Sequence, residues 1–402
     1  MNKKLNYIYK ISITLFCISI ICIDLLEVKD FGIDRLFYKV KPLFADLITI
    51  IPSIEELNIL GSSTKIKISS TETMNRAMNY PLLWVYIFDF FGKFTDPYKL
   101  FGYGQIFIYF SFLGSYLIKI KKNFLLTSLV VFSPPILLIF DRGNNDLFIF
   151  FLVFLSIYKE KIISGFLFGL ASALKIYPLF LFPFILFYKR DKKKFIIGFL
   201  FTIPIIIISF SQLNIFLGNT AISFSSSFGI LATALFFKKI LSIFFSYDLS
   251  IYFFIIFSLF LFVSQSFILN FFFKSEIKEM INKILKNNKN SEIFILFTIL
   301  SLFIFAIFCN WAYRIIFLLP SICIIINSIS FNNRLLQIKE IIVIIILTFP
   351  FTSTWFLFSN NEILLNHYSW ALYAPIVFIS MSLYFLILLA IIRLKIKINY
   401  SQ

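Results

Sequence analysis

Charged and amide side chains separate two apolar runs of the chain. They lie in the segment Asp141-Arg142-Gly143-Asn144-Asn145-Asp146-Leu147. A charge at the depth of a lipid bilayer costs about 2.5–3.5 kcal/mol on insertion scales, so it persists mainly where it faces a polar cavity or a ligand. In such a cavity a carboxylate can accept a proton, and an arginine can pair with phosphate oxygens. The segment therefore indicates a site of chemistry. The alternative is that Arg142 pairs with Asp141 or Asp146 and only ties helices together.

Several cations are predicted on the same side of the membrane as this segment. They are Arg142, Lys175, Arg314 and His367, which is the only histidine of the chain. A cavity with several cations suits an anionic lipid headgroup, because phosphate oxygens pair with arginine forks and lysine point charges while the lipid tail stays in the bilayer.

A carboxylate at Asp46 lies just outside the first predicted span. It could take a proton from an acceptor hydroxyl, and partial burial would raise its pKa toward the range that suits a general base. The alternative, a helix cap or an interfacial aspartate, is what composition alone favours. The segment Met78-Asn79-Tyr80-Pro81 can also be explained without a functional role. A proline in the first helical turn and an aromatic residue at the membrane interface account for most of its residues.

The elements that must position these residues are apolar helices. The chain is 60% hydrophobic and 14% charged, whereas a soluble domain is about 25% charged. Because lipid admits only helices and closed barrels, and long stretches are apolar on every face, we predict an all-α polytopic membrane protein. The net charge of +17 does not favour nucleic-acid binding, because the Lys and Arg residues cluster at loop ends, as the positive-inside rule requires.

About twelve spans are expected, in a single integral-membrane domain over residues 1–402 with both termini in the cytoplasm. They lie near residues 8–26, 99–118, 124–140, 147–158, 162–174, 176–188, 195–211, 249–273, 292–309, 315–330, 338–358 and 370–392. Spans four to six have only twelve or thirteen residues, or about 18–20 Å of helix, against a hydrocarbon core of about 30 Å. Their outer ends therefore indicate a recessed, hydrated cavity.

Two connecting segments stand out. Residues 27–98 are predicted as a large extracytoplasmic first loop, with interfacial helices at 42–60 and 80–94. Residues 274–291 are predicted as a Lys- and Asn-rich cytoplasmic connector. The sequence contains no phosphate loop, dinucleotide fingerprint or Cys/His metal set, so we expect neither a metal nor another cofactor.

The polar segments occur in an order that resembles a known family. The series consists of Phe44-Ala45-Asp46-Leu47, Met78-Asn79-Tyr80-Pro81, Pro134-Pro135 with Asp141–Leu147, Gly165…Gly169-Leu170-Ala171…Ala173-Leu174-Lys175…Tyr177-Pro178, and Tyr313-Arg314. It resembles the bacterial polyprenyl-phosphate-mannose-dependent mannosyltransferases, glycosyltransferase family 87 of the GT-C superfamily. The resemblance covers most of residues 40–330.

The resemblance implies a GT-C-like multi-helix core in the cytoplasmic (inner) membrane, with the active site facing the periplasm or exterior. It implies inverting transfer of a hexose, with mannose as the expected sugar, from a polyprenyl-phosphate donor to a lipid or glycan acceptor. Asp46 matches the general base, and the resemblance assigns the donor phosphate to Lys175 and Arg314, and secondarily to Arg142. His367 lies outside the matching motifs and is added to the phosphate ligands only as a further cation on the same side of the membrane. Polar support is expected from Asn144, Asp146, Asn79, Tyr80, Tyr177 and Tyr313.

Two other functions remain open. A transporter or flippase for a lipid-linked sugar would share the spans and the cationic cavity, but transporters often show internal repeats, and the two halves of this chain show no such symmetry. A polysaccharide ligase or polymerase would handle the same donors, but its large outer loop usually comes late in the chain.

Overall fold

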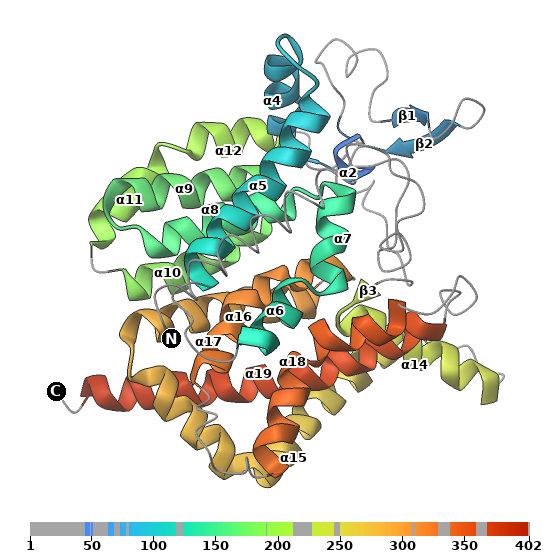
Figure 1. Ribbon diagram of the computed structural model, residues 1–402, viewed down its shortest axis with the longest axis vertical. Coiled ribbons are helices and arrows are strands. Elements are labelled where there is room, and N and C mark those ends of the chain that lie inside the picture. Colours follow the sequence, from blue (N-terminus) through green and yellow to red (C-terminus); the bar gives the residue numbers. More distant parts are fainter. Residues whose placement is uncertain are drawn as a thin grey trace. The chain divides into compact units, whose positions relative to one another are not determined.

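The computed structural model describes residues 45–48, 50, 63–67, 73–77, 80–117, 124–189, 191–211, 227–244, 250–307, 310–328, 338–358 and 368–400. Helices make up most of these residues, as predicted (Figure 1). Two small antiparallel strand pairs, β1–β2 and β3–β4, were not predicted. The residues form two compact units, one from the described parts of 1–121 and 137–221 and the other from those of 122–136 and 222–402.

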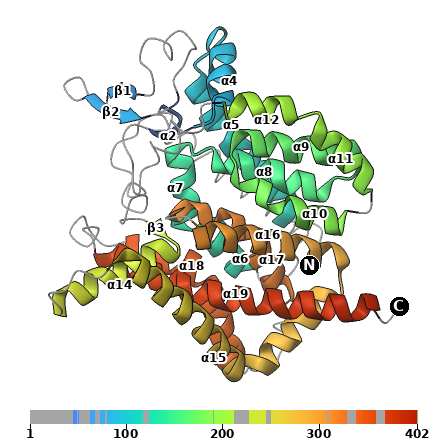
Figure 2. The ribbon, with the colours of Figure 1, turned by 180° about the vertical axis from the view of Figure 1, so that it is seen from behind.

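The first unit is a helical layer with one hairpin. Its elements are α2 (Ala45–Ile48), β1 (Ser63–Lys67), β2 (Thr73–Ala77), α4 (Leu83–Gly92), α5 (Pro97–Leu117), the end of α7 (Pro134–Arg142), α8 (Asp146–Tyr158), α9 (Lys161–Leu174), η2 (Tyr177–Leu181), α10 (Phe182–Tyr188), α11 (Lys192–Leu200) and α12 (Ile203–Ser209). Helix α9 packs against α8, α11 and α12, and α8 also contacts α5 (Figure 2).

Glycines allow α9 and α11 to approach each other closely. A Cβ atom added at Gly165 would lie 1.8 Å from the backbone oxygen of Phe195, and one at Gly198 would lie 1.9 Å from that of Ile162. A small residue on each helix is thus required for this contact, as is common between membrane helices. Because Gly165 and Gly169 are four residues apart on α9, both lie on its packed face.

The start of α11 is capped by Asp191, whose side chain accepts a hydrogen bond from the backbone N–H of Lys194. The side-chain hydrogen bond from Lys194 lowers the pKa of the Asp191 carboxyl below its usual value, and the backbone hydrogen bond and the charge of Lys194 lower it further. The cap satisfies one of the orphan N–H groups of the first turn of α11.

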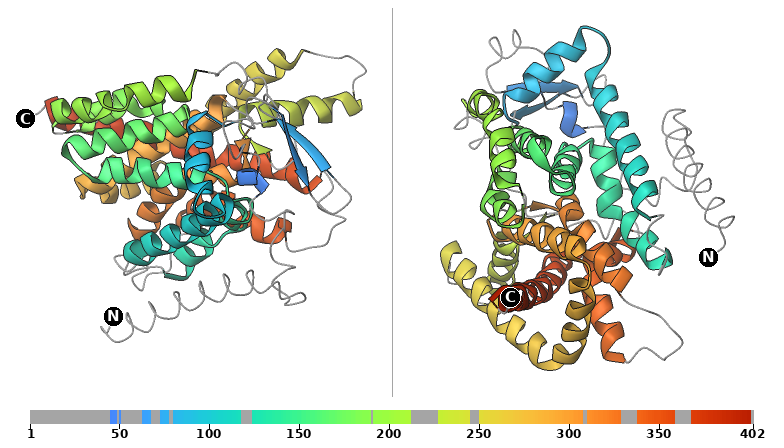
Figure 3. Two further views of the ribbon diagram at one scale, coloured as in Figure 1. Left: turned by 90° about the horizontal axis from the view of Figure 1, so that it is seen from above. Right: turned by 90° about the vertical axis from the view of Figure 1, so that its left-hand side faces the viewer.

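The second unit is built around its last helix. Its elements are α6 (Phe124–Val131), β3 (Ser227–Phe228), α14 (Ile230–Phe244), α15 (Ile251–Leu285), α16 (Asn288–Ile307), β4 (Asn310–Trp311), η3 (Ala312–Leu318), α17 (Leu319–Ser328), α18 (Ile338–Phe358) and α19 (Tyr368–Tyr400). Helix α19 packs against α14, α15, α16 and α18 (Figure 3). The hydroxyls of Ser380 and Tyr384 on α19 donate hydrogen bonds to the carbonyls of Ile346 and Leu347 on α18. Hydrogen bonds of this kind, from a hydroxyl to a carbonyl, hold helices together inside a membrane, where the hydrophobic effect between helices is weak.

Three helices of the described residues are long and apolar enough to cross a membrane, namely Ile251–Leu285, Asn288–Ala306 and Pro375–Lys395. The prediction of about twelve spans with cytoplasmic termini is therefore not confirmed. The first predicted span, 8–26, lies outside the described residues.

Prolines divide several of the predicted spans. The stretch 124–140 forms α6 and α7 with a break before Pro134, and the stretch 195–211 forms α11 and α12 with Pro204 at the start of α12. The stretch 176–188 is the 3-10 helix η2 followed by α10, each with a proline in its first turn. Proline lacks the N–H donor and disfavours the helical conformation in the residue before it, so an apolar run with an internal proline tends to break there.

One connecting segment, predicted at residues 274–291, is more helical than expected. Helix α15 continues through a kink at Phe273 to Leu285, into the segment predicted as a connector. There it buries Ile277, Met280 and Ile281.

Candidate active site

The polar segment singled out in the sequence forms a tight turn between α7 and α8. Gly143 has a φ of 59°, in the left-handed region. Its N–H donates to the carbonyl of Phe140 at 2.9 Å, and the N–H of Asn144 donates to the carbonyl of Ile139 at 3.0 Å. These are the two bonds of a Schellman motif, which ends a helix at a glycine. The turn thus stops α7 immediately after Arg142 and restarts the chain as α8 at Asp146.

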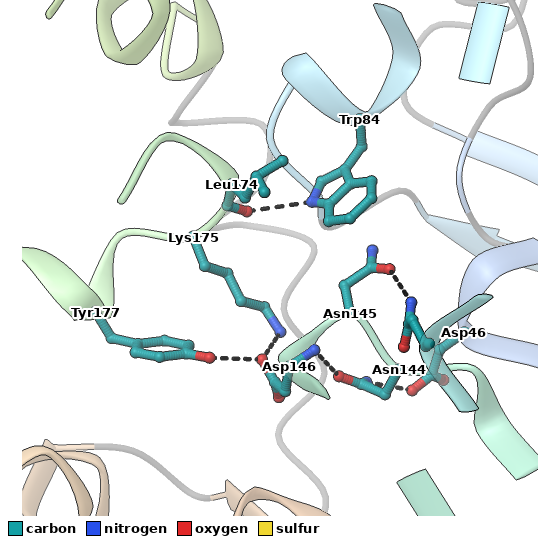
Figure 4. Close-up of polar contacts among 9 residues, drawn as sticks. Asp46, Trp84, Asn144, Asn145, Asp146, Leu174, Lys175 and Tyr177 are labelled. Carbon is teal, nitrogen blue, oxygen red and sulfur yellow. Dashed lines mark hydrogen bonds and ion pairs between the residues drawn. The ribbon is translucent and has the colours of Figure 1, made fainter. Parts of the chain in front are cut away.

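Asn144 connects this turn to the distant Asp46. Its Oδ1 accepts a hydrogen bond from the backbone N–H of Asp146 at 2.9 Å, and so caps α8. Its Nδ2 donates to Oδ2 of Asp46 at 2.5 Å. Because the cap determines how the amide is oriented, the start of α8 also directs an N–H donor at the Asp46 carboxylate (Figure 4).

Asp46 forms a buried ion pair with Arg142. The Nε atom of Arg142 donates to Oδ1 of Asp46 at 3.0 Å, and Nη2 donates to the same oxygen. The Asp46 and Arg142 residues are only 5% and 6% exposed, respectively. Charge-assisted hydrogen bonds favour the ionised carboxylate, whereas burial alone would disfavour it. Arg142 was expected to pair with Asp141 or Asp146, or with a phosphate. In the structure it pairs with Asp46.

A second ion pair joins Lys175 and Asp146. The Nζ atom of Lys175 bonds to Oδ1 of Asp146, and the hydroxyl of Tyr177 donates to the same oxygen at 2.8 Å (Figure 4). The ammonium lies 5.6 Å from the ring centre of Tyr80 and 5.9 Å from that of Tyr177, within the range of cation–π attraction. Asp146 is fully buried in the first turn of α8, where the helix dipole favours a negative charge.

The end of α9 positions Lys175. The indole N–H of Trp84 donates to the carbonyl of Leu174 at 3.2 Å, and the hydroxyl of Ser209 donates to that of Ala173. Both carbonyls belong to the last turn of α9, where carbonyl groups have no N–H partner within the helix. Side chains of α4 and α12 therefore hold the point at which the chain leaves α9, and Lys175 follows directly.

An amide pair lies on the same turn and was not recognised in the sequence. Gln105 of α5 donates from Nε2 to Oδ1 of Asn145 at 3.4 Å. Both residues are buried, with 3% and 0% exposure. The signal that could have revealed this pair is Gln105 itself, a polar residue within an apolar predicted span.

The structure brings seven residues together within the first unit. They are Asp46, Tyr80, Arg142, Asn144, Asp146, Lys175 and Tyr177, all of which were predicted site residues. Their carboxylates and cations occur in equal number. Each cation shown here already faces a carboxylate, so an incoming anion would have to share it.

The remaining predicted site residues belong to the second unit or are not described. Arg314 is half-buried in η3 of the second unit, and the side chain of its neighbour Tyr313 is not described. Asn79 and His367 lie outside the described residues. In the part of the chain that the structure covers, no three His, Cys, Asp or Glu side chains gather as a metal site would require.

Comparison with known families gives one match. Residues 98–267 match the model of glycosyltransferase family 87. The match includes Gln105, the turn from Arg142 to Asp146, and the Lys175–Tyr177 pair, and it begins after Asp46. It supports a glycosyltransferase function for a chain with membrane helices. No curated protein and no solved structure matches the chain.

Proposed function

We propose that the chain is a membrane glycosyltransferase that moves a hexose, with mannose as the expected sugar, from a polyprenyl-phosphate donor to a lipid or glycan acceptor. Transfer takes place on the extracytoplasmic side of the cell's inner membrane and inverts the anomeric centre. The family 87 match supports the enzyme class. The observation that carries the proposal is the buried Asp46 carboxylate, held in one orientation by Arg142 and Asn144.

Asp46 acts as the general base in this proposal. The acceptor hydroxyl attacks the anomeric carbon opposite the phosphate and gives its proton to the Asp46 carboxylate. The new carbon–oxygen bond forms as the bond to phosphate breaks, and that electron pair leaves with the polyprenyl phosphate. A base must be ionised and within hydrogen-bonding reach of the hydroxyl before transfer. The contacts from Arg142 and Asn144 favour the ionised state and limit the rotation of the carboxylate.

The donor phosphate is assigned to cations that compensate its charge as it departs. Lys175 carries three N–H donors, one of which bonds to Asp146, so the ammonium would be shared between Asp146 and the phosphate. Arg314 and His367 are proposed as further phosphate ligands, and Arg142 as a weaker one because it is engaged by Asp46. Cations that bind the leaving group more tightly in the transition state than in the ground state raise kcat.

Substitution of the base tests the proposal. The full-length protein in sealed lipid vesicles is incubated with radiolabelled polyprenyl-phosphate mannose and a membrane lipid extract as the source of acceptor. Asp46→Asn should lower the transfer rate by about 100- to 10,000-fold, the usual contribution of a general base, while donor binding is retained. The matched control is Asp89→Asn, because Asp89 lies half-buried on α4, and it should transfer at the normal rate.

The same assay separates the alternative functions. Near-normal transfer by Asp46→Asn would remove Asp46 from the mechanism. Label that changes leaflet without entering a new product would support a flippase and contradict the proposal. Label that enters a long polymer rather than a singly glycosylated product would support a polymerase.

A further inference from the structure

The amide pair of Gln105 and Asn145 has hydrogen-bonding capacity that the protein does not use. Within the part of the chain that the structure describes, Oε1 of Gln105 and Nδ2 of Asn145 are buried and have no hydrogen-bond partner. The one bond between the two amides is long, at 3.4 Å. Buried polar atoms are nearly always satisfied, so two unsatisfied atoms on touching side chains point to a missing ligand.

The unused capacity consists of one donor group and one acceptor. Rotating both amides by 180° exchanges their roles but leaves the same count, because each amide carries one oxygen and one NH2 group. Rotating only one amide would face two oxygens or two NH2 groups and would break the existing bond. The pair therefore presents a donor and an acceptor to its ligand in any orientation that keeps the two amides bonded.

This combination selects the chemistry of the ligand. A phosphate or a carboxylate offers only acceptors and would leave the acceptor of the pair unsatisfied, and an ammonium offers only donors. A hydroxyl group both donates and accepts. We propose that Gln105 and Asn145 bind one hydroxyl group of the hexose that is transferred, and so help to determine which sugar is accepted. This inference rests on the proposed glycosyltransferase function.

The place of the pair on the turn favours a substrate hydroxyl. Asn145 lies between Asn144, which bonds to Asp46, and Asp146, which bonds to Lys175 (Figure 4). The three successive side chains thus contact three different groups. Asn144 contacts the proposed base, Asn145 contacts Gln105, and Asp146 contacts the proposed phosphate ligand. The side chain of Asn145 makes no cap hydrogen bond at the start of α8, so helix capping does not account for its amide. An ordered water molecule offers the same hydrogen-bonding chemistry, and the experiment must separate the two.

The test compares donor selectivity with and without the amides. Polyprenyl-phosphate mannose and its 2-, 3-, 4- and 6-deoxy derivatives are assayed with the full-length protein in nanodiscs and with the Gln105→Met/Asn145→Leu variant, whose side chains are of similar size. The unaltered protein should lose roughly 10- to 100-fold in kcat/KM for one deoxy derivative, as expected for one or two unpaired buried groups. The variant should lose most of this discrimination for that derivative alone. Gln265→Met, on α15, is the matched control and should keep the normal selectivity.

Each outcome decides the inference. Equal discrimination in the unaltered protein and the variant would overturn it, and a lowered melting temperature of the variant would then point to an ordered water as the occupant, because its hydrogen bonds to the two amides are lost. If the double variant does not fold, Gln105→Met and Asn145→Leu are assayed separately under the same criterion.

A separate readout distinguishes failure of the inference from failure of the proposed function. Should the unaltered protein transfer from none of these donors, the proposed function fails. The hydroxyl site is then tested by the thermal stabilisation that methyl α-mannoside and its deoxy derivatives confer. Stabilisation by the parent glycoside that is lost for one deoxy derivative, and lost in the variant, supports the site. Equal stabilisation of both proteins, or none of either, overturns it.

Discussion

Arg142 holds the carboxylate of Asp46 through Nε and Nη2, although the two residues are 96 positions apart in the chain. Both side chains are buried, so each compensates a charge that would otherwise lie uncompensated inside the protein. The pair joins α2, which contains the proposed base, to the turn that contains Asn144 and Asp146. One contact thereby ties the base to the segment that carries the other polar residues of the site.

Removing only one member of this pair should destabilise the protein more than removing both. Arg142→Gln leaves the buried Asp46 carboxylate without its cation, and should lower the free energy of unfolding by about 3–5 kcal/mol. In the Asp46→Asn/Arg142→Gln variant the uncompensated charge is gone, so part of that loss should be recovered. Denaturant unfolding in detergent micelles measures all four proteins of the cycle. Losses that simply add would show that the two residues are not coupled.

Gly143 should be difficult to replace because of its left-handed backbone. Gly143→Ala places a Cβ atom in a conformation with a φ of 59° and should destabilise the protein by about 1–2 kcal/mol. Gly143→Asn should be milder, because asparagine adopts this conformation more readily than other residues. Thermal unfolding of the two variants gives the comparison. An alanine variant as stable as the unaltered protein would mean that the turn adopts another conformation.

The contact between α9 and α11 should be intolerant of a single methyl group. Gly165→Ala would bring a Cβ atom to 1.8 Å from the backbone oxygen of Phe195, so the helices would have to separate. Overpacking of this kind destabilises by about 1–3 kcal/mol or more. The control is Gly104→Ala on α5, where no atom lies within 4 Å of the added carbon.

This control should act in the opposite direction. Alanine in the middle of a helix is more favourable than glycine by roughly 0.5–1 kcal/mol, so Gly104→Ala should raise the free energy of unfolding slightly. Denaturant unfolding in the same detergent compares the two variants directly. Equal stability of the two would contradict the packing seen between α9 and α11.

Some features of the site follow from local signals. A glycine after Arg142, followed by two asparagines and an aspartate, combines the residue types that end one helix and start the next. The apolar runs around this turn are helices. Lys175 and Asp46 were already candidate site residues because they carry charges near predicted spans, and the family resemblance supported Asp46 and added Tyr177. Gln105 gives a weaker signal of the same kind, which the sequence analysis overlooked.

The extent of the membrane spans was less predictable. The predicted spans overlooked the breaks that Pro134 and Pro204 signal. An apolar run indicates burial in lipid or in protein, but it does not tell which helix crosses a membrane. The hairpin of β1 and β2 was missed because its residues, such as Lys65 and Asn75, do not alternate between apolar and polar side chains.

The sequence by itself determined the helical, apolar character of the described chain and the turn at Gly143, because propensity, capping and proline effects act between residues only a few positions apart. Only the tertiary structure decided that Arg142 faces Asp46, that Lys175 faces Asp146, and that Gln105 meets Asn145. These pairs join separate helices, and several partners of suitable charge were available to each residue. The packing of the helices decides among these partners. That packing depends on contacts between apolar side chains and on the close approach of the helices at the glycines.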